Sequence, residues 1–534
     1  MHASHFVRFA IASLAVVGAS VATAQGRLRL DRVYESEDWG YEIRPIRGWN
    51  SMPADQDDKY TVGRWKLDVA DLRKRGDYEG ANAGTFCELR IIRIQPEVVT
   101  PGGNDQTTEK PQTPTLPASL AKRLDPKNID DWIEANYDGA SKRWLRGPFK
   151  GGEMDGDLIE FGHRSSHVTI GVFEHMAVQW AVVYTCFEET YQKTWRDIYI
   201  ESIETFEVTR KVDPDAAAAK RKDLSELEGE ELREALHLSI SSNPGWFAID
   251  TKHYVFLSNA DRRFVQRLGK DLETVRKKMY VPMFPPRNKK VPLSPVRVFA
   301  TQAEYHQFGG PRGSAGYFSP SKGELVLYAK FEDQSSSKSE DDCKSVMFHE
   351  GFHQYIHFAV GDVSPHSWFN EGHGDYFAGI KVFGGRVRVE PFDWRVDYLK
   401  RHMQKGDDLI PTRSLIRYLQ SEYYSNAGLK YSQGWALIYY LREVSREKSH
   451  KDILDTYFSY LADNIQAFRE KKKKDDEGDE VGGESVPGIP GLRIVDFEDR
   501  EKVEQILSEA VDKAFANVNL EALDEDFRRW LEKL

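Results

Sequence analysis

The sequence predicts an α+β protein, in which an N-terminal α/β sandwich domain at 28–210 is followed by a mainly helical domain with a small mixed sheet at 241–534. Short apolar runs that alternate with period two dominate the first part, and helical apolar periodicity dominates the second. Between them, 211–240 is polar and helix-forming with an alanine run, as expected of a helical linker. A chain of 534 residues is long enough for two or three hydrophobic cores.

The first 24 residues have the pattern of a secretory signal peptide. Arg8 precedes an apolar run at 9–21, and Ala22-Thr23-Ala24 supplies small residues for cleavage. This run is too short, and too rich in alanine and glycine, for a membrane span of about 20 residues. We therefore expect an exported protein, periplasmic or extracellular, with no membrane span after cleavage.

In the N-terminal domain, strand-like alternation occurs at 41–46, 87–94, 168–173 and 176–185, and helical patterns occur at 130–142 and 191–205. The segment 100–116 is rich in proline, glycine and threonine, which predicts a loop within this domain. The opening strand leads into the turn Arg47-Gly48-Trp49, and the closing helix leads into a strand. This layout is similar to PsbP-like domains, a resemblance that implies a fold but no chemistry.

The charge of the chain bears on its partners, and its cysteines bear on a possible disulfide. Lys and Arg number 74 against 85 Asp and Glu, a formal net charge of −11, which argues against nucleic acid or anionic lipid as partners. The basic run 471–474 is followed at once by acids, glycines and prolines, so we expect a disordered loop at 470–491. Cys87 and Cys186 lie in strand-like runs, where a disulfide and two free thiols are equally compatible with the sequence. Cys343 is expected to be a small core residue.

The C-terminal domain opens with strand patterns at 254–257 and 296–299 that flank a helix at 262–279. A hairpin follows, with strands at 316–318 and 325–328. Further helices are expected over 339–361, from about Trp368, over 435–441 and over 501–534. For the helix at 339–361, Ser339 with Asp342 matches a capping box and Gly361 a C-terminal stop.

The most specific motif of the chain is His349-Glu350-Gly351-Phe352-His353. Residues four apart on a helix project from the same face, so both imidazoles can converge on one ion with Glu350 beside it. A catalytic zinc site takes three protein ligands and leaves one position for water. Glu371, eighteen positions after His353, is the candidate third ligand, and one Zn²⁺ per chain is expected. The alternative is a helix that merely carries two partly exposed histidines.

With these residues the chain resembles the gluzincin branch of zinc metallopeptidases, in the peptidase MA-like superfamily, and most of all secreted bacterial members whose domain has no assigned function. The resemblance rests on the histidine motif, on Asn370-Glu371-Gly372 and on Tyr431 in Tyr431-Ser432-Gln433-Gly434-Trp435. It implies that His349, His353 and Glu371 hold the zinc and that Tyr431 helps to hold the oxyanion. The spacer before Glu371 is one residue shorter than in aminopeptidase members, and their Gly-x-Met-Glu-Asn strand has no counterpart here, so amino-terminal trimming is not expected.

The implied chemistry is hydrolysis of a peptide bond, and of internal bonds in particular, by a zinc-activated water with Glu350 as general base. Tyr431 would donate to the developing oxyanion; its alternative is an ordinary half-buried aromatic. Asp375, with Asn370 beside the ligands, would orient a liganding histidine, or else Asp375 is a solvated surface charge. The hairpin strand Leu325-Val326-Leu327 is expected to bind an extended substrate, or else to be plain core.

Two rival functions stay open at this point. One is a non-catalytic envelope protein that binds a partner or acts as a scaffold and retains a zinc site. The other is a zinc amidase that acts on a cell-wall amide. In all three interpretations the expected partner is not a nucleic acid, and for the leading one it is a peptide or protein substrate.

Overall fold

The protein was analysed as a computed structural model, which describes residues 28–54, 58, 60–67, 87–95, 126–175, 177–188, 191–210, 224, 227–287, 291–331, 334–406, 408–478 and 497–534. The chain is mixed α+β, as expected. The signal peptide at 1–24, the loop at 100–116 and the first part of the linker at 211–240 lie outside these residues. The described end of that linker is helical, in α7 (Gly229–Ser241).

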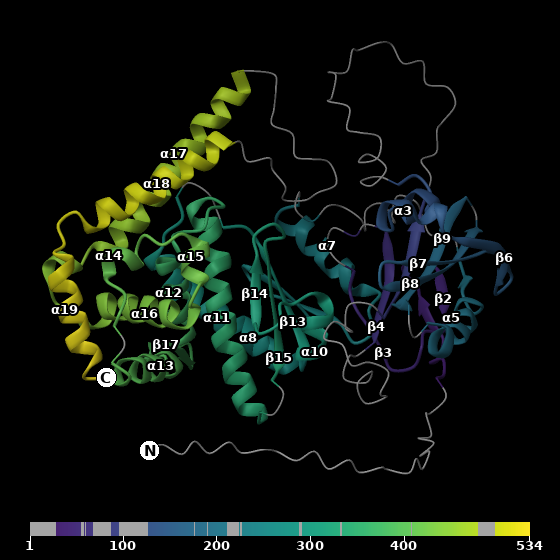
Figure 1. The fold of residues 1–534 in the computed structure, drawn as a ribbon, viewed down its shortest axis with the longest axis horizontal. Coiled ribbons are helices and arrows are strands. Elements are labelled where there is room, and N and C mark those ends of the chain that lie inside the picture. Colours follow the sequence, from purple (N-terminus) through teal and green to yellow (C-terminus); the bar gives the residue numbers. More distant parts are fainter. Residues whose placement is uncertain are drawn as a thin grey trace, which may run out of the picture.

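The N-terminal region, residues 28–210, is built on an antiparallel seven-stranded sheet (Figure 1). Its strands, in spatial order, are β3 (Trp49–Ser51), β4 (Thr61–Leu67), β5 (Glu88–Ile94), β9 (Val178–Phe187), β8 (Ser166–His175), β7 (Met154–His163) and β6 (Leu145–Gly151). A smaller antiparallel sheet joins β1 (Tyr34–Ser36), β2 (Tyr41–Ile43) and β10 (Glu207–Val208). The four strands predicted in this region are all present.

Helices cover both faces of the seven-stranded sheet. Successive residues of a strand point to opposite faces, and in β5 Ile91 packs with α5 (Arg196–Ile203) while Ile92 packs with α3 (Ile129–Asn136). Because both faces are buried, the central strands carry continuous apolar runs instead of strict alternation. Strands β3, β4, β6 and β7 were not predicted; in β6 and β7, glycines and charged residues interrupt the apolar pattern.

The C-terminal region, residues 227–534, contains a mixed five-stranded sheet. Its spatial order is β11 (Phe247–Asp250), β12 (Tyr254–Ser258), β13 (Ser294–Thr301), β15 (Glu324–Lys330) and β14 (Gly316–Ser319). The three central strands are parallel, and β11 and β14 are antiparallel edges. The predicted hairpin is therefore confirmed as β14 and β15. A separate hairpin joins β16 (Ile380–Phe383) and β17 (Arg386–Val389).

Helices make up the rest of this region. The long helix α11 (Ser336–Val360) packs on β14 and β15 with one side and on α12 (Ser367–Ala378) with the other (Figure 1). Behind α12 lies α16 (Ala427–Tyr439), which α13 (Asp393–Gln404) and α15 (Gln420–Tyr424) contact. The remaining helices are α8 (Arg262–Val275), α9 (Val281–Met283), α10 (Gln302–Phe308), α14 (Thr412–Leu415), α17 (Ile453–Gly478), α18 (Phe497–Phe515) and α19 (Leu520–Leu531).

Three predicted boundaries differ from the structure. Helix α11 begins earlier than expected, because Ser335 accepts the hydrogen bond from the Lys338 N–H, while Ser339 is buried inside the helix and accepts from the Phe331 N–H. Its predicted end is confirmed, since Gly361 has φ +109°. Helix α17 runs to Gly478, so the first part of the expected loop at 470–491 is helical; 479–491 lie outside the described residues. The expected terminal helix at 501–534 is two helices, α18 and α19.

Cys87 and Cys186 are buried and are not joined by a disulfide, so the disulfide alternative does not hold in this structure. The two residues nonetheless face each other across adjacent strands, since Glu88 pairs with Thr185 in the antiparallel register of β5 and β9. Cys343 is buried in the C-terminal core, as expected. Among the described helices, none is both long and apolar enough to cross a bilayer.

Candidate metal centre

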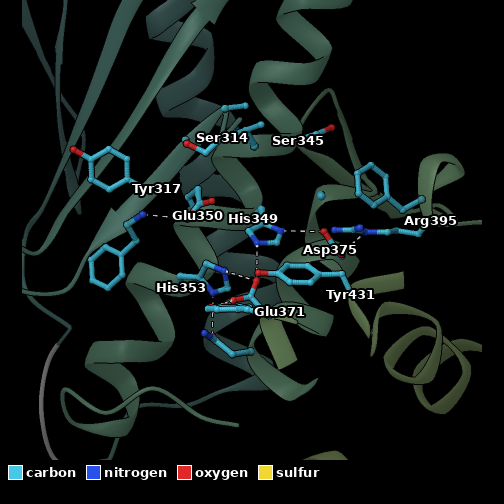
Figure 2. A pocket seen from close by; sticks show the side chains of 18 of the residues that line it. Ser314, Tyr317, Ser345, His349, Glu350, His353, Glu371, Asp375, Arg395 and Tyr431 are labelled. Carbon is cyan, nitrogen blue, oxygen red and sulfur yellow. Dashed lines mark hydrogen bonds and ion pairs between the residues drawn. The ribbon is translucent and has the colours of Figure 1, made fainter. Parts of the chain in front are cut away.

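The two histidines of α11 and Glu371 of α12 meet at one point (Figure 2). Nε2 of His349 and Nε2 of His353 each lie 3.3 Å from the same oxygen, Oε2 of Glu371. The three candidate ligand atoms all lie within 4.8 Å of one another. Tetrahedral zinc with bonds of 2.0–2.1 Å holds its ligand atoms roughly 3.3 Å apart. The spacing and the donor set therefore fit a zinc ion.

Contacts behind the histidines fix which nitrogen each one presents. Nδ1 of His349 lies 3.1 Å from Oδ1 of Asp375, and Nδ1 of His353 lies 3.0 Å from Oδ1 of Asn370. When each Nδ1–H donates to its oxygen, the lone pair of each Nε2 points at the space beside Glu371. Asp375 is only 2% exposed, so it is not the solvated surface charge that the sequence left open. Asp375 and Asn370 thus lie behind the two histidines, on the side away from Glu371.

Arg395, on α13, completes this arrangement and was not predicted. Its Nε donates to Oδ2 of Asp375 at 2.6 Å, and its guanidinium lies 5.1 Å from the ring centre of Tyr431. The arginine neutralises Asp375 and supports the tyrosine ring at the same time. No local signal in the sequence marks Arg395, because α13 follows the hairpin of β16 and β17 and reaches the site only through its packing on α16.

Two tyrosines stand over Glu371. The Tyr424 hydroxyl donates to Oε1 of Glu371 at 2.9 Å, while Tyr431 stacks on Tyr424 with ring centres 6.0 Å apart. Burial and the negative charge of Glu371 raise the pKa of Tyr431, so its hydroxyl stays protonated and able to donate. The same causes raise the pKa of Tyr424 to about 12. Tyr431 lies inside α16, which begins at Ala427 and therefore earlier than the helix expected over 435–441.

Glu350 lies on the side of the histidines that faces away from Tyr431, next to Tyr317 of β14 (Figure 2). Its Oε2 accepts a hydrogen bond from the Phe318 backbone N–H at 3.1 Å. Glu350 does not belong to the group of three convergent ligand atoms. The hydrogen bond holds its carboxylate at the wall of the pocket.

Burial and charge act against each other on the three candidate ligands. Burial lowers the pKa of His349, but its hydrogen bonds to Asp375 and Glu371 prevail and hold it well above the ordinary value. Burial likewise lowers the pKa of His353, but the nearby Glu371 raises it by more, so the pKa lies above the ordinary value. For Glu371 burial raises the pKa, yet the two histidines lower it below the ordinary range. The Glu371 carboxylate is therefore ionised at neutral pH and available as a ligand.

The centre opens into a pocket of about 680 Å³. Its walls come from the segment before β14 and β14 itself, from α11 and α12, and from α13, α15 and α16; its aromatic members are Tyr317, Phe318, Phe392, Trp394, Tyr424 and Tyr431. Its charged members are three carboxylates, Glu350, Glu371 and Asp375, and one guanidinium, Arg395. With neutral histidines, these four groups give the pocket a formal charge of −2.

The sequence predicted that Leu325-Val326-Leu327 binds substrate, but in the structure the other strand of this hairpin, β14, lies at the edge of the sheet and lines the pocket. Leu325, Val326 and Leu327 lie on β15, which is the inner strand, and their side chains are at most 1% exposed. They are core residues, because β14 separates β15 from the edge of the sheet. The residues of the hairpin that line the pocket are Gly316, Tyr317 and Phe318 on β14. Periodicity alone cannot say which strand of a hairpin becomes the edge.

Two further histidines lie close to the motif in the sequence, His357 and His373. His373 is fully buried; its Nδ1 lies 2.8 Å from the Phe369 carbonyl oxygen, and its Nε2 accepts from Arg442. Burial, followed by the Arg442 charge, holds the pKa of His373 well below the ordinary value, so it is neutral. His357 does not belong to the metal-ligand group of the described residues either.

Comparisons with known proteins add little to this geometry. No protein-family model matches the chain, and no curated protein does. The solved structures that are similar include the cyanobacterial PsbP protein (CyanoP) of Synechocystis sp. PCC 6803, at 12% identity over 36% of this chain and 98% of that one, with a TM-score of 0.21. Another, from Bacteroides thetaiotaomicron VPI-5482, is 9% identical over 71% of this chain and 94% of that one, with a TM-score of 0.20. The first agrees with the PsbP-like layout expected of 28–210, but likenesses this weak carry no argument.

Proposed function

We propose that this protein is an exported zinc metallopeptidase that hydrolyses internal peptide bonds. The observation that carries the proposal is the convergence of Nε2 of His349, Nε2 of His353 and Oε2 of Glu371, with each histidine held from behind by its own acceptor. A structural pair of histidines has no need of such an arrangement, whereas a zinc ligand requires a neutral ring with a fixed tautomer.

Charge balance supports a divalent cation at this point. Three pocket carboxylates face one arginine, and a net charge of −2 in a partly buried pocket is costly unless a cation compensates it. Protonation of the two histidines would restore neutrality, and so would one Zn²⁺. Of these, only the metal uses the tetrahedral spacing of the three ligand atoms.

The residues around the centre can each be given a task. A zinc ion bound here would supply a Lewis acid that activates water and polarises the scissile carbonyl. Glu350, held beside β14 by the Phe318 N–H, would accept the proton from the attacking water and pass it to the leaving amine. Tyr431, whose hydroxyl stays protonated, would donate to the carbonyl oxygen as its negative charge grows.

The edge strand β14 gives a reason to favour an extended peptide as substrate. One side of β14 pairs with β15, and its residues line the pocket next to Glu350. An extended chain can add to such an edge through backbone hydrogen bonds, which read the main chain more than the side chains. This proposal includes the gluzincin assignment for 241–534 and the export that 1–24 suggests.

The decisive experiment compares the purified protein with Glu350→Gln. We expect the variant to keep the zinc content of the wild type and to lose activity on a mixed peptide pool by roughly 10²–10⁴-fold, the contribution of a general base. Asp341→Asn is the matched control, because Asp341 is an exposed acid on the same helix. Mass spectrometry of the products, with and without a chelator, gives the readout. Stoichiometric zinc without cleavage of any peptide would favour the scaffold interpretation.

A further inference from the structure

The N-terminal region contacts the C-terminal region directly at α10. Nζ of Lys66, on β4, donates to the Gln307 carbonyl oxygen at 2.6 Å, and Nε2 of Gln307 donates to the Leu67 carbonyl oxygen at 3.0 Å. Lys66 is 5% exposed and Gln307 is 2% exposed. Burial of a lysine and an amide is costly unless both are hydrogen-bonded, so this reciprocal pair specifies one docking geometry.

An apolar contact accompanies the pair. Met52, which follows β3, is 1% exposed and packs in one cluster with Phe299, Tyr305 and Phe308 of the C-terminal region. Polar contacts at the end of α7 add to it: Asn243 Nδ2 donates to Ser51 Oγ at 3.1 Å. The contact is thus apolar at Met52 with hydrogen bonds around it, like a stable interdomain interface.

From α10 the contact continues to the wall of the pocket. The hydroxyls of Tyr305, on α10, and Ser314 are 2.6 Å apart, and the Gly310 N–H donates to the Tyr305 carbonyl oxygen. A Cβ at Gly310 would lie only 2.3 Å from the Tyr305 ring, so the loop packs tightly on this side chain. Residues 313–316, which run from this loop to the first residue of β14, line the pocket, and we call them the pocket rim.

The rim needs such support because of its sequence. Gly309, Gly310, Gly313 and Gly316 give the segment more conformational freedom than other residues would, and Gly309 and Gly313 have positive φ. The rim leads straight into β14, whose Phe318 N–H holds Glu350. Displacement of α10 would therefore alter both the pocket wall and the position of the general base.

We infer that the N-terminal region is a positioning part of the catalytic unit: by clamping α10 through Lys66, Leu67 and Met52, it holds the rim at 313–316 and β14 in place beside Glu350. This inference rests on the proposed function for its kinetic consequence only. Its structural consequence, the order of the rim, is independent of any reaction.

The test uses full-length protein with Lys66→Met, alone and combined with Met52→Ala. Methionine has a side chain of similar length to lysine but lacks the Nζ hydrogen-bond donor. We expect amide hydrogen exchange at 313–318 to accelerate about 5–10-fold, the effect of losing one buried hydrogen bond. With an active enzyme, kcat/KM should fall by a similar factor, whereas zinc content should stay unchanged.

Ile133→Ala is the matched control. Ile133 is fully buried in a cluster formed by residues of the N-terminal region, so its truncation destabilises that region without removing a contact to α10. We expect this variant to exchange at 313–318 at the wild-type rate. Unchanged exchange at 313–318 in the double variant would overturn the inference, and so would equal acceleration in Ile133→Ala. An inactive wild type would instead refute the proposed function and leave the exchange result to decide this inference.

Discussion

Glu88 in the N-terminal region and Glu371 in the C-terminal region are both largely buried, and the pKa of each is lowered, so both are ionised at neutral pH. The charges of the residues around them differ. Glu88 lies among three cations, Arg64, Arg90 and Lys66. Burial raises its pKa, yet these charges outweigh burial and lower the pKa of Glu88 to about 2. The chain itself therefore supplies more than enough positive charge to balance the Glu88 carboxylate.

Glu371 has no such surplus of cations. Its partners are His349, His353 and Tyr424, and the pocket around it holds two further carboxylates against one arginine. The two sites teach that burial of a carboxylate is not by itself a sign of function. The sign is a group of buried carboxylates that the cations of the chain do not balance, placed so that the free lone pairs of several ligands meet at one point.

The largest expected effect is the loss of metal from Glu371→Ala. Removal of one of three ligands should lower the zinc content, after dialysis, from close to one per chain to less than about a tenth of that, as elemental analysis would measure. Glu88→Ala should retain full zinc, because its cluster has no part in the centre. Full zinc in Glu371→Ala would show that another residue is the third ligand.

For stability, we expect the larger effect at Glu88. Glu88→Gln leaves three cations without their carboxylate, and we expect it to lower the free energy of unfolding of the N-terminal region by about 3 kcal/mol. Denaturant unfolding followed by tryptophan fluorescence measures this loss. Glu174→Gln, an exposed acid on β8 of the same sheet, is the control and should change stability by less than about 0.5 kcal/mol. Equal effects of the two variants would contradict the comparison.

The smallest expected effect is a difference in pH dependence. The pKa of Glu88 is depressed from 4.5 to about 2, so its contribution to stability is present above pH 4.5 and is lost as the pH falls toward 2. The pKa values of His349 and His353 are raised, so their contribution without metal is present below their ordinary pKa and is lost as the pH rises through the raised values. Zinc needs both rings neutral, and its stabilising effect should therefore grow as the pH rises.

Melting curves with and without zinc, recorded from pH 5 to 9, check this prediction. The zinc-induced rise in melting temperature should increase across that range, while the stability difference between wild type and Glu88→Gln stays constant there. A zinc effect that decreases with rising pH would argue against the two histidines as ligands.

Much of the local structure could be predicted from the sequence. The four strands in the N-terminal region, the hairpin of β14 and β15, and the end of α11 at Gly361 follow from patterns that span a few residues. The start of α11 did not follow, because Ser335 and Ser339 are both good capping residues and only burial of Ser339 distinguishes them. In the same way, the sequence could not tell that β14, and not β15, is the edge.

The sequence by itself determined that His349 and His353 share one face of a helix, because the helical repeat is set by backbone hydrogen bonds within a few residues. Only the tertiary structure decided that Oε2 of Glu371 lies 3.3 Å from both rings, that Arg395 and Tyr424 join the site, and that Lys66 clamps α10. These contacts join residues from separate elements. Their distances depend on how whole helices and sheets pack, which no short stretch of sequence specifies.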